Sequence, residues 1–170
     1  MKVLSKQSNS RMCFICGMDN PIGLKAQFYN MEDGSVMTLF RYKKEHQSFP
    51  QRVHGGLIAT MLDELGLRAM WAKDTEKVFG VTISMEVKYR KPVPYDHELI
   101  GRGIVEKETA HFVLIRTEIY DEDCTLLANG ELKYVKLPPE QIAQGVDPHE
   151  EMCYQLDDDR KEIPFLRSSS

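Results

Sequence analysis

One stretch of the chain carries a long helical pattern of hydrophobic and polar positions. Between Val53 and Trp71, apolar residues recur every three or four positions, as they do on a helix with one buried face. These apolar positions are Ile58, Met61, Leu62, Leu65 and Ala69. The pattern predicts one long amphipathic helix, and we expect no second helix of this length.

The other hydrophobic patterns alternate with a period of two, which is typical of strands with one buried face. Turn signals rich in Gly, Asp and Pro separate them. The predicted strands cover residues 25–30, 35–42, 79–90, 97–107, 112–120 and 124–135. Two strands therefore precede the helix and four follow it.

One helix cannot cover both faces of such a sheet. The favoured α+β solution is the hotdog fold, in which a curved antiparallel sheet of five or six strands wraps a long central helix. The outer face and the edges of the sheet then favour self-association.

Length and composition are those of one ordinary globular domain of 170 residues. We expect a hotdog domain at 13–137, between a loose polar arm at 1–12 and an acidic, partly disordered tail at 138–170.

No apolar run approaches the roughly 20 residues of a membrane helix, and the first residues lack a secretory pattern. We therefore expect a cytoplasmic protein without a membrane partner. The net charge of −4 and the lack of a long basic block argue against nucleic acid as a partner.

The start of the predicted helix has the features of an oxyanion site. Gly55 and Gly56 let a ligand approach the backbone, and the first N–H groups of a helix have no helical acceptor. Together with the helix dipole, these groups stabilise a carbonyl oxygen that gains negative charge. The alternative is that the two glycines only permit a tight entry into the helix.

Two adjacent carboxylates lie at the middle of the predicted helix. Glu64 precedes Arg68 by four residues, the spacing of a surface ion pair, so we interpret Glu64 as solvated. Asp63 has small, largely uncharged helical neighbours, which indicates that another surface packs close to it. A carboxylate is costly to bury without a partner, so we assign the functional role to Asp63; an exposed helical Asp is the alternative.

The spacing of these groups predicts a dimer. Gly55 and Asp63 are eight residues apart, which is about 12 Å along a helix. One helix therefore cannot bring both groups to one small reacting centre. If both act on the same carbonyl, they come from two copies of the chain, and the sites lie at a symmetric interface. A dimer and a dimer of dimers are both compatible with this reasoning.

Several motifs, in their order and spacing, resemble the PaaI-type acyl-CoA thioesterases of the hotdog superfamily, and one bacterial and archaeal branch in particular. The resemblance covers about residues 13–136. The motifs are Cys13-x-x-Cys16-Gly17, Asn20-Pro21-x-Gly23-Leu24, Glu45-His46-Gln47 before Phe49-Pro50, His54-Gly55-Gly56 six residues before Asp63, and Tyr89-Arg90-Lys91-Pro92-Val93.

The resemblance implies hydrolysis of acyl-CoA thioesters to free acid and coenzyme A, without a cofactor. It implies that Asp63 is the general base or the nucleophile. It also implies that Gly55 donates its N–H to the thioester carbonyl from the other subunit, and that His54 shapes the site. Thr82 would orient the attacking water.

Two further sets of positions are implied less directly. Many family members carry Asn or Gln six residues before the histidine, where this chain has Ser48 beside Gln47, so either residue is a candidate for positioning the water. The phosphates of coenzyme A call for cations, and Arg90 and Lys91 are candidates, with Gly56 at the helix start. Met61 and Met70 are candidates for the acyl pocket, although each is as easily a core residue.

Other chemistries fit less well. The chain lacks a G-x-S-x-G elbow, which excludes an α/β-hydrolase route. A non-catalytic acyl-CoA sensor and a hotdog hydratase or dehydratase are the alternative functions.

Cys13 and Cys16 have the spacing of half a zinc site without a second half. A zinc shared across a dimer, a redox pair and buried thiols are all compatible; we favour buried thiols and expect no metal.

Overall fold

The structure, a computed structural model, describes residues 1–72, 78–143, 145, 147–155 and 158–165. Within these residues, one antiparallel sheet of seven strands and one long helix form the centre of the molecule. The strands are β1 (Val3–Lys6), β2 (Gln27–Met31), β3 (Val36–Phe40), β4 (Gly80–Tyr89), β5 (Leu99–Glu108), β6 (Phe112–Tyr120) and β7 (Leu126–Lys136). The helices are η1 (Lys44–His46), α1 (Gly55–Met70), α2 (Pro139–Ile142) and α3 (Pro148–Glu151). None of the described helices has the length and apolar character needed to cross a membrane.

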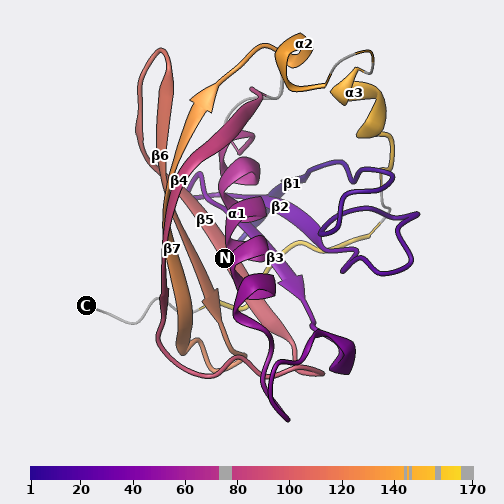
Figure 1. Cartoon of the computed structure of the whole chain (residues 1–170), viewed down its shortest axis with the longest axis vertical. Helices are drawn as coiled ribbons and strands as arrows, with labels where there is room; N and C mark the ends of the chain where they lie inside the picture. The colour runs from indigo at the N-terminus through magenta and orange to yellow at the C-terminus, as the bar shows by residue number, and fades with distance from the viewer. Residues whose placement is uncertain (73–77, 144, 146, 156–157, 166–170) are drawn as a thin grey trace.

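The sheet curves around α1, which lies against its concave face (Figure 1). The strand order β1-β2-β3-β5-β6-β7-β4 places β1 and β4 at the two edges. Apolar side chains of α1 and of the sheet form one core cluster between them. This is the predicted hotdog arrangement, with seven described strands instead of the expected five or six.

A glycine in β5 brings sheet and helix close together. A Cβ atom at Gly103 would lie 2.4 Å from the carbonyl oxygen of Leu65 in α1. Real Cβ atoms do not approach oxygen so closely, so only glycine allows this spacing. The close approach fixes the position of the helix over the central strands.

The prediction of a loose arm at residues 1–12 is wrong. Strand β1 pairs with β2 and supplies the seventh strand. Polar residues 7–10 are buried, because their side chains bond to backbone groups. The Asn9 amide donates to the carbonyl oxygens of Cys16 and Ala26 at 2.8 and 2.9 Å. The Gln7 amide donates to the Arg68 carbonyl oxygen at 2.9 Å.

Residues 158–165 of the acidic tail pack against β2, β3 and β5. Ile163 and Phe165 are buried in a second apolar cluster, which also contains Tyr29, Met31, Met37 and Ile100 of β2, β3 and β5. A bridge between Lys2 and Glu162 ties this segment to the start of the chain. These contacts order the residues involved, and the partly disordered tail and the limits of the hotdog domain stay predictions.

Strand β4 lies at the other edge, with β7 as its one strand partner among the described residues. Four large apolar side chains of β4 are exposed: Val81, Ile83, Met85 and Tyr89. An unpaired edge with exposed apolar side chains is the kind of surface that another chain covers.

Candidate functional site

The start of α1 is capped by the side chain of His54. The Nδ1 atom of its ring accepts a hydrogen bond from the Gly56 N–H at 3.0 Å, and the backbone N–H of His54 donates to the His46 carbonyl oxygen at 2.9 Å. No hydrogen bond from the Gly55 N–H is found within the described part of the chain. Of the two glycine N–H groups, that of Gly55 is therefore the one available to a ligand.

Gly55 also lies against Tyr89 of β4. The Tyr89 hydroxyl donates to the Gly55 carbonyl oxygen at 3.0 Å. An added Cβ at Gly55 would lie 3.5 Å from the Tyr89 ring, an ordinary contact distance. The ring and the helix start thus form one wall of a groove.

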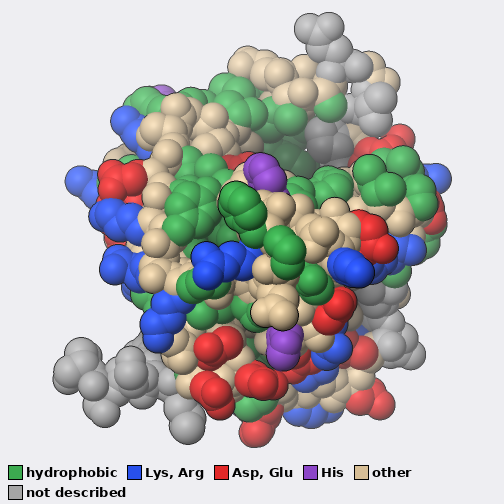
Figure 2. Space-filling view, turned by 60° about the horizontal axis from the view of Figure 1, so that its bottom comes forward, with side chains coloured by type: hydrophobic (Ala, Val, Ile, Leu, Met, Phe, Trp, Pro, Cys, Tyr) green, Lys and Arg blue, Asp and Glu red, His purple; other side chains and the backbone are tan. Residues whose placement is uncertain are grey.

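This groove has a volume of about 350 Å³ and brings together Gly55, Ser48, Arg90 and Lys91, four residues singled out in the sequence. Its other lining residues are Phe49, Arg52, Val53, Ile58, Tyr89 and Pro92. Figure 2 shows the end of the molecule where α1 begins, with hydrophobic, Lys or Arg, and histidine side chains close together on its surface. The mixture suits a ligand that has an apolar part and anionic groups.

Arg52 is a third cation at this groove that the sequence reasoning missed. It lies in the loop before α1, outside any pattern that marks a binding residue. Arg90 is held in place, because its Nε atom donates to the Asn129 Oδ1 atom at 2.6 Å. Ser48 lies in the same loop, and its N–H donates to the Arg52 carbonyl oxygen at 2.9 Å. Gln47 is exposed and does not line the groove.

Asp63 lies farther along α1, half-buried and facing the start of β4. The Thr82 hydroxyl donates to the Asp63 Oδ1 atom at 2.6 Å. The Tyr134 hydroxyl donates to the Asp63 carbonyl oxygen at 2.6 Å and lies 3.1 Å from the same Oδ1 atom. Thr82 was predicted to orient a water molecule; in the single chain it orients Asp63 itself.

Tyr134 is a second site residue, after Arg52, that the sequence did not predict. Burial and the neighbouring Asp63 carboxylate raise its pKa above the ordinary value, so its hydroxyl stays protonated as a donor. A Cβ at Gly66 of α1 would lie 2.5 Å from this hydroxyl. A glycine inside a helix costs about 1 kcal/mol relative to alanine. Gly66 is therefore the sequence signal that could have indicated a close neighbour one turn after Asp63.

Met61 and Met70 are not brought to the groove. Both are buried in the core cluster between α1 and the sheet. Their predicted contact with an acyl chain is therefore unsupported, and the core interpretation holds.

The interpretation of Glu64 as a solvated surface residue is wrong. Its Oε1 atom accepts a hydrogen bond from the Arg68 Nε atom at 2.8 Å, so the predicted pair exists. However, the side chains of Arg68 and Glu64 are only 1% and 13% exposed. The guanidinium also donates to the Ser8 carbonyl oxygen and lies over the ring of Phe28. The N-terminal segment folds over this face of the helix, which periodicity within α1 could not reveal.

A curved antiparallel sheet around one helix, with an acid on that helix and a groove at its start, defines a hotdog protein with a candidate ligand site. Comparison with known proteins agrees with this description of the fold. Residues 51–128 match the family model of the Thioesterase superfamily. This segment runs from the loop before α1 into β7 and contains Gly55, Asp63 and Thr82.

The individual relatives are distant. Acyl-coenzyme A thioesterase THEM4 of Rattus norvegicus is 25% identical over 138 residues, which cover 80% of this chain and 58% of the relative. The chain thus spans little more than half the length of this relative. The PaaI protein of E. coli, from the phenylacetic acid degradation operon, is 15% identical with a TM-score of 0.61, covering 68% of this chain and 81% of that chain.

A hypothetical thioesterase protein of Streptococcus pneumoniae, solved with coenzyme A, is 16% identical with a TM-score of 0.58, covering 66% of this chain and 85% of that chain. The solved structures establish the shared fold. The family-model match and the rat relative confirm the resemblance to thioesterases that the motifs predict.

Proposed function

We propose that the chain hydrolyses acyl-CoA thioesters at sites formed between two copies of itself. The observation that carries the proposal is the half-buried carboxylate of Asp63, held by Thr82 and Tyr134 on a helix whose first residue offers an N–H group. Both side-chain bonds reach Oδ1, and no bond to Oδ2 is found among the described residues. Oδ2 is therefore the atom that faces a reactant.

The chemistry needs one acid and one oxyanion donor. The Gly55 N–H donates to the thioester carbonyl oxygen and stabilises the negative charge that gathers there. Asp63 either accepts a proton from the attacking water or attacks the carbonyl carbon itself. In both routes the carbon–sulfur bond breaks and the coenzyme A sulfur takes up a proton that comes from water. The acyl group leaves as a free acid, directly in the first route and, in the second, after water hydrolyses the anhydride that it forms with Asp63.

The second copy is needed for a geometric reason. Gly55 and Asp63 are separated by eight residues of one continuous helix, about 12 Å, so they reach one carbonyl only from two different helices. The unpaired edge of β4, with its exposed apolar side chains, adjoins Asp63 through Thr82. Pairing of two β4 edges would cover these side chains and bring two α1 helices together.

Coenzyme A fits the groove at the start of α1. Arg52, Arg90 and Lys91 supply positive charge for its phosphates, next to the Gly55 N–H. That a relative of the same fold was solved with coenzyme A supports the ligand class. The thioesterase name of the rat relative supports the reaction. The cytoplasmic location and the lack of a nucleic-acid partner stay predictions.

The test is thiol release from a panel of acyl-CoA thioesters of different acyl lengths. Asp63→Asn keeps an oxygen acceptor for Thr82 and removes the base or nucleophile. We expect kcat to fall by about 10²–10⁴-fold with little change in the urea midpoint. Glu122→Gln, in the exposed turn after β6, is the matched control and should retain the full rate. An unchanged rate in Asp63→Asn, or tight acyl-CoA binding without thiol release, would overturn the proposal; the second result would identify a sensor.

A further inference from the structure

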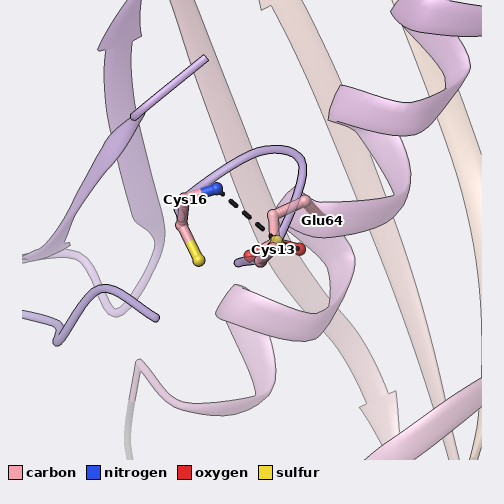
Figure 3. A group of neighbouring side chains, drawn as sticks. All are labelled: Cys13, Cys16 and Glu64. Atoms are coloured by element: carbon pink, nitrogen blue, oxygen red, sulfur yellow. Dashed lines mark hydrogen bonds between the residues drawn. The ribbon is translucent and has the colours of Figure 1, made fainter. Parts of the chain in front are cut away.

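Cys13 and Cys16 lie on a tight loop beside α1 (Figure 3). The N–H groups of Ile15 and Cys16 point at the Cys13 Sγ atom, at 3.3 and 3.5 Å. The Gly17 N–H donates to the Cys13 carbonyl oxygen at 2.8 Å. A Cβ at Gly17 would lie 2.4 Å from that oxygen, so only glycine closes the loop. These bonds fix the Cys13 sulfur on the inside of the loop, next to Glu64 of α1.

Glu64 of α1 supplies a third donor. Its Oε2 atom lies 3.6 Å from the Cys13 Sγ atom, and the ligand atoms of Cys13, Cys16 and Glu64 all lie within 4.8 Å of one another. With Zn–S of about 2.3 Å and Zn–O of about 2.1 Å at a tetrahedral angle, sulfur and oxygen ligands lie about 3.6 Å apart. The observed sulfur–oxygen separation therefore matches a tetrahedral site.

The surroundings orient and balance these donors. Arg68 holds the other Glu64 oxygen, Oε1, at 2.8 Å, which leaves Oε2 directed at the cysteines. Two thiolates and one carboxylate carry three negative charges, and Arg68 contributes one positive charge. A divalent cation makes the group neutral. Cys16 is 1% exposed, whereas Cys13 and Glu64 are partly exposed, so one side of the group is open to an incoming ion.

We propose that Cys13, Cys16 and Glu64 bind a divalent, thiophilic metal ion such as Zn²⁺, with one coordination position left for water or an external ligand. Two thiolates favour zinc over the oxygen-seeking Mg²⁺ and Ca²⁺. The site joins the N-terminal segment to a different face of the helix that carries Asp63. Its occupation stabilises the folded chain, because the ligands come together only there.

The test uses the full chain, reduced, loaded with ZnCl₂ and desalted. We expect about one zinc per chain in the wild type and in Cys153→Ser, the matched control at an exposed cysteine outside the group. Cys13→Ser and Cys16→Ser should retain little zinc. Cobalt(II) is the second probe: thiolate ligation gives an intense charge-transfer absorption, which both variants should lose.

Glu64→Gln should weaken zinc binding by about 10-fold or more. This change also disturbs the buried Arg68, so X-ray absorption of the zinc-loaded wild type serves as the independent measurement. Two sulfur ligands with oxygen ligands support the proposal. It is overturned if the reduced wild type retains no zinc, or if Cys13→Ser and Cys16→Ser retain as much zinc as Cys153→Ser. Because zinc content is measured without substrate, failure here is distinct from failure of the proposed hydrolysis.

Discussion

The N–H group of Gly55 can be removed without disturbing the fold. Gly55 is the first residue of α1, a position where proline is readily accepted, because an N–H there has no helical acceptor. His54 has φ −64° and ψ 132°, the extended conformation that a residue before proline adopts. Gly55→Pro therefore deletes the donor and keeps the helix start. The matched control is Gly55→Ala, which keeps the N–H and adds a Cβ in ordinary contact with Tyr89, at 3.5 Å.

The expected magnitude follows from the role of the group. Loss of one oxyanion donor typically lowers kcat by about 10²–10³-fold, or about 2.7–4 kcal/mol. Gly55→Pro should show this loss in thiol release from an acyl-CoA, whereas Gly55→Ala should stay within a few-fold of the wild type. Urea unfolding should show that both variants are folded. A folded Gly55→Pro variant with the wild-type rate would refute the role of this N–H group.

Mixing two inactive variants tests whether the site is shared between subunits. Asp63→Ala lacks the acid and Gly55→Pro lacks the donor, so a mixed dimer contains one intact site and one site that lacks both. Random exchange at equal concentrations makes half of the dimers mixed, which restores about one quarter of the wild-type activity. Co-purification through two different tags shows that mixed dimers form. Mixed dimers without recovered activity would place the reacting groups in one chain and refute the interface site.

Two further predictions concern the positioning of Asp63 and the response to acid. Tyr134→Phe removes a hydroxyl that is bonded twice to Asp63, so we expect the free energy of unfolding in urea to fall by about 1.5–3 kcal/mol and kcat to fall as well. Thr82→Val, at an exposed residue, should lower kcat with little loss of stability. Equal stability of Tyr134→Phe and the wild type would contradict this account. Burial, together with the charge of Lys43, lowers the pKa of His46 in the folded chain below its ordinary 6.5. The Nδ1 atom of His46 must also stay unprotonated to accept the hydrogen bond from the Lys43 N–H. Neutral His46 therefore stabilises the folded chain above pH 6.5, and this stabilisation is lost as the pH falls below that value. Between about pH 7.5 and about pH 5.5, the free energy of unfolding should therefore fall less in His46→Asn than in the wild type. An equal fall in both proteins would exclude His46 as the cause.

The sequence predicted the fold well where burial follows a regular period. The stripe along α1 and the alternation in the long strands both come from one apolar face, and the six predicted strands correspond to β2 through β7. Strand β1 was missed because Val3–Lys6 has only four residues, two apolar followed by two polar, and so shows no alternation of period two. The residues that follow it are polar yet buried, because they bond to backbone groups that come together only in the folded chain.

The candidate site was predicted where its residues share one helix or lie in a motif. Gly55, Asp63, Arg90 and Lys91 were found in this way. Tyr134 was missed because its bond to Asp63 joins positions 71 residues apart, and no local pattern reports such a contact.

The two adjacent acids of α1 show how one helix holds two separate chemistries. Successive residues of a helix point about 100° apart, so Asp63 and Glu64 face different neighbours. Asp63 meets Thr82 of the unpaired edge strand, where a second copy can reach it. Glu64 meets Arg68 and Cys13, under a segment of its own chain. The i, i+4 spacing of Glu64 and Arg68 was read correctly as an ion pair, but spacing does not tell whether solvent or protein covers the pair. The choice of Asp63 over Glu64 therefore rests on the exposed β4 edge beside it, and not on the pairing of its neighbour.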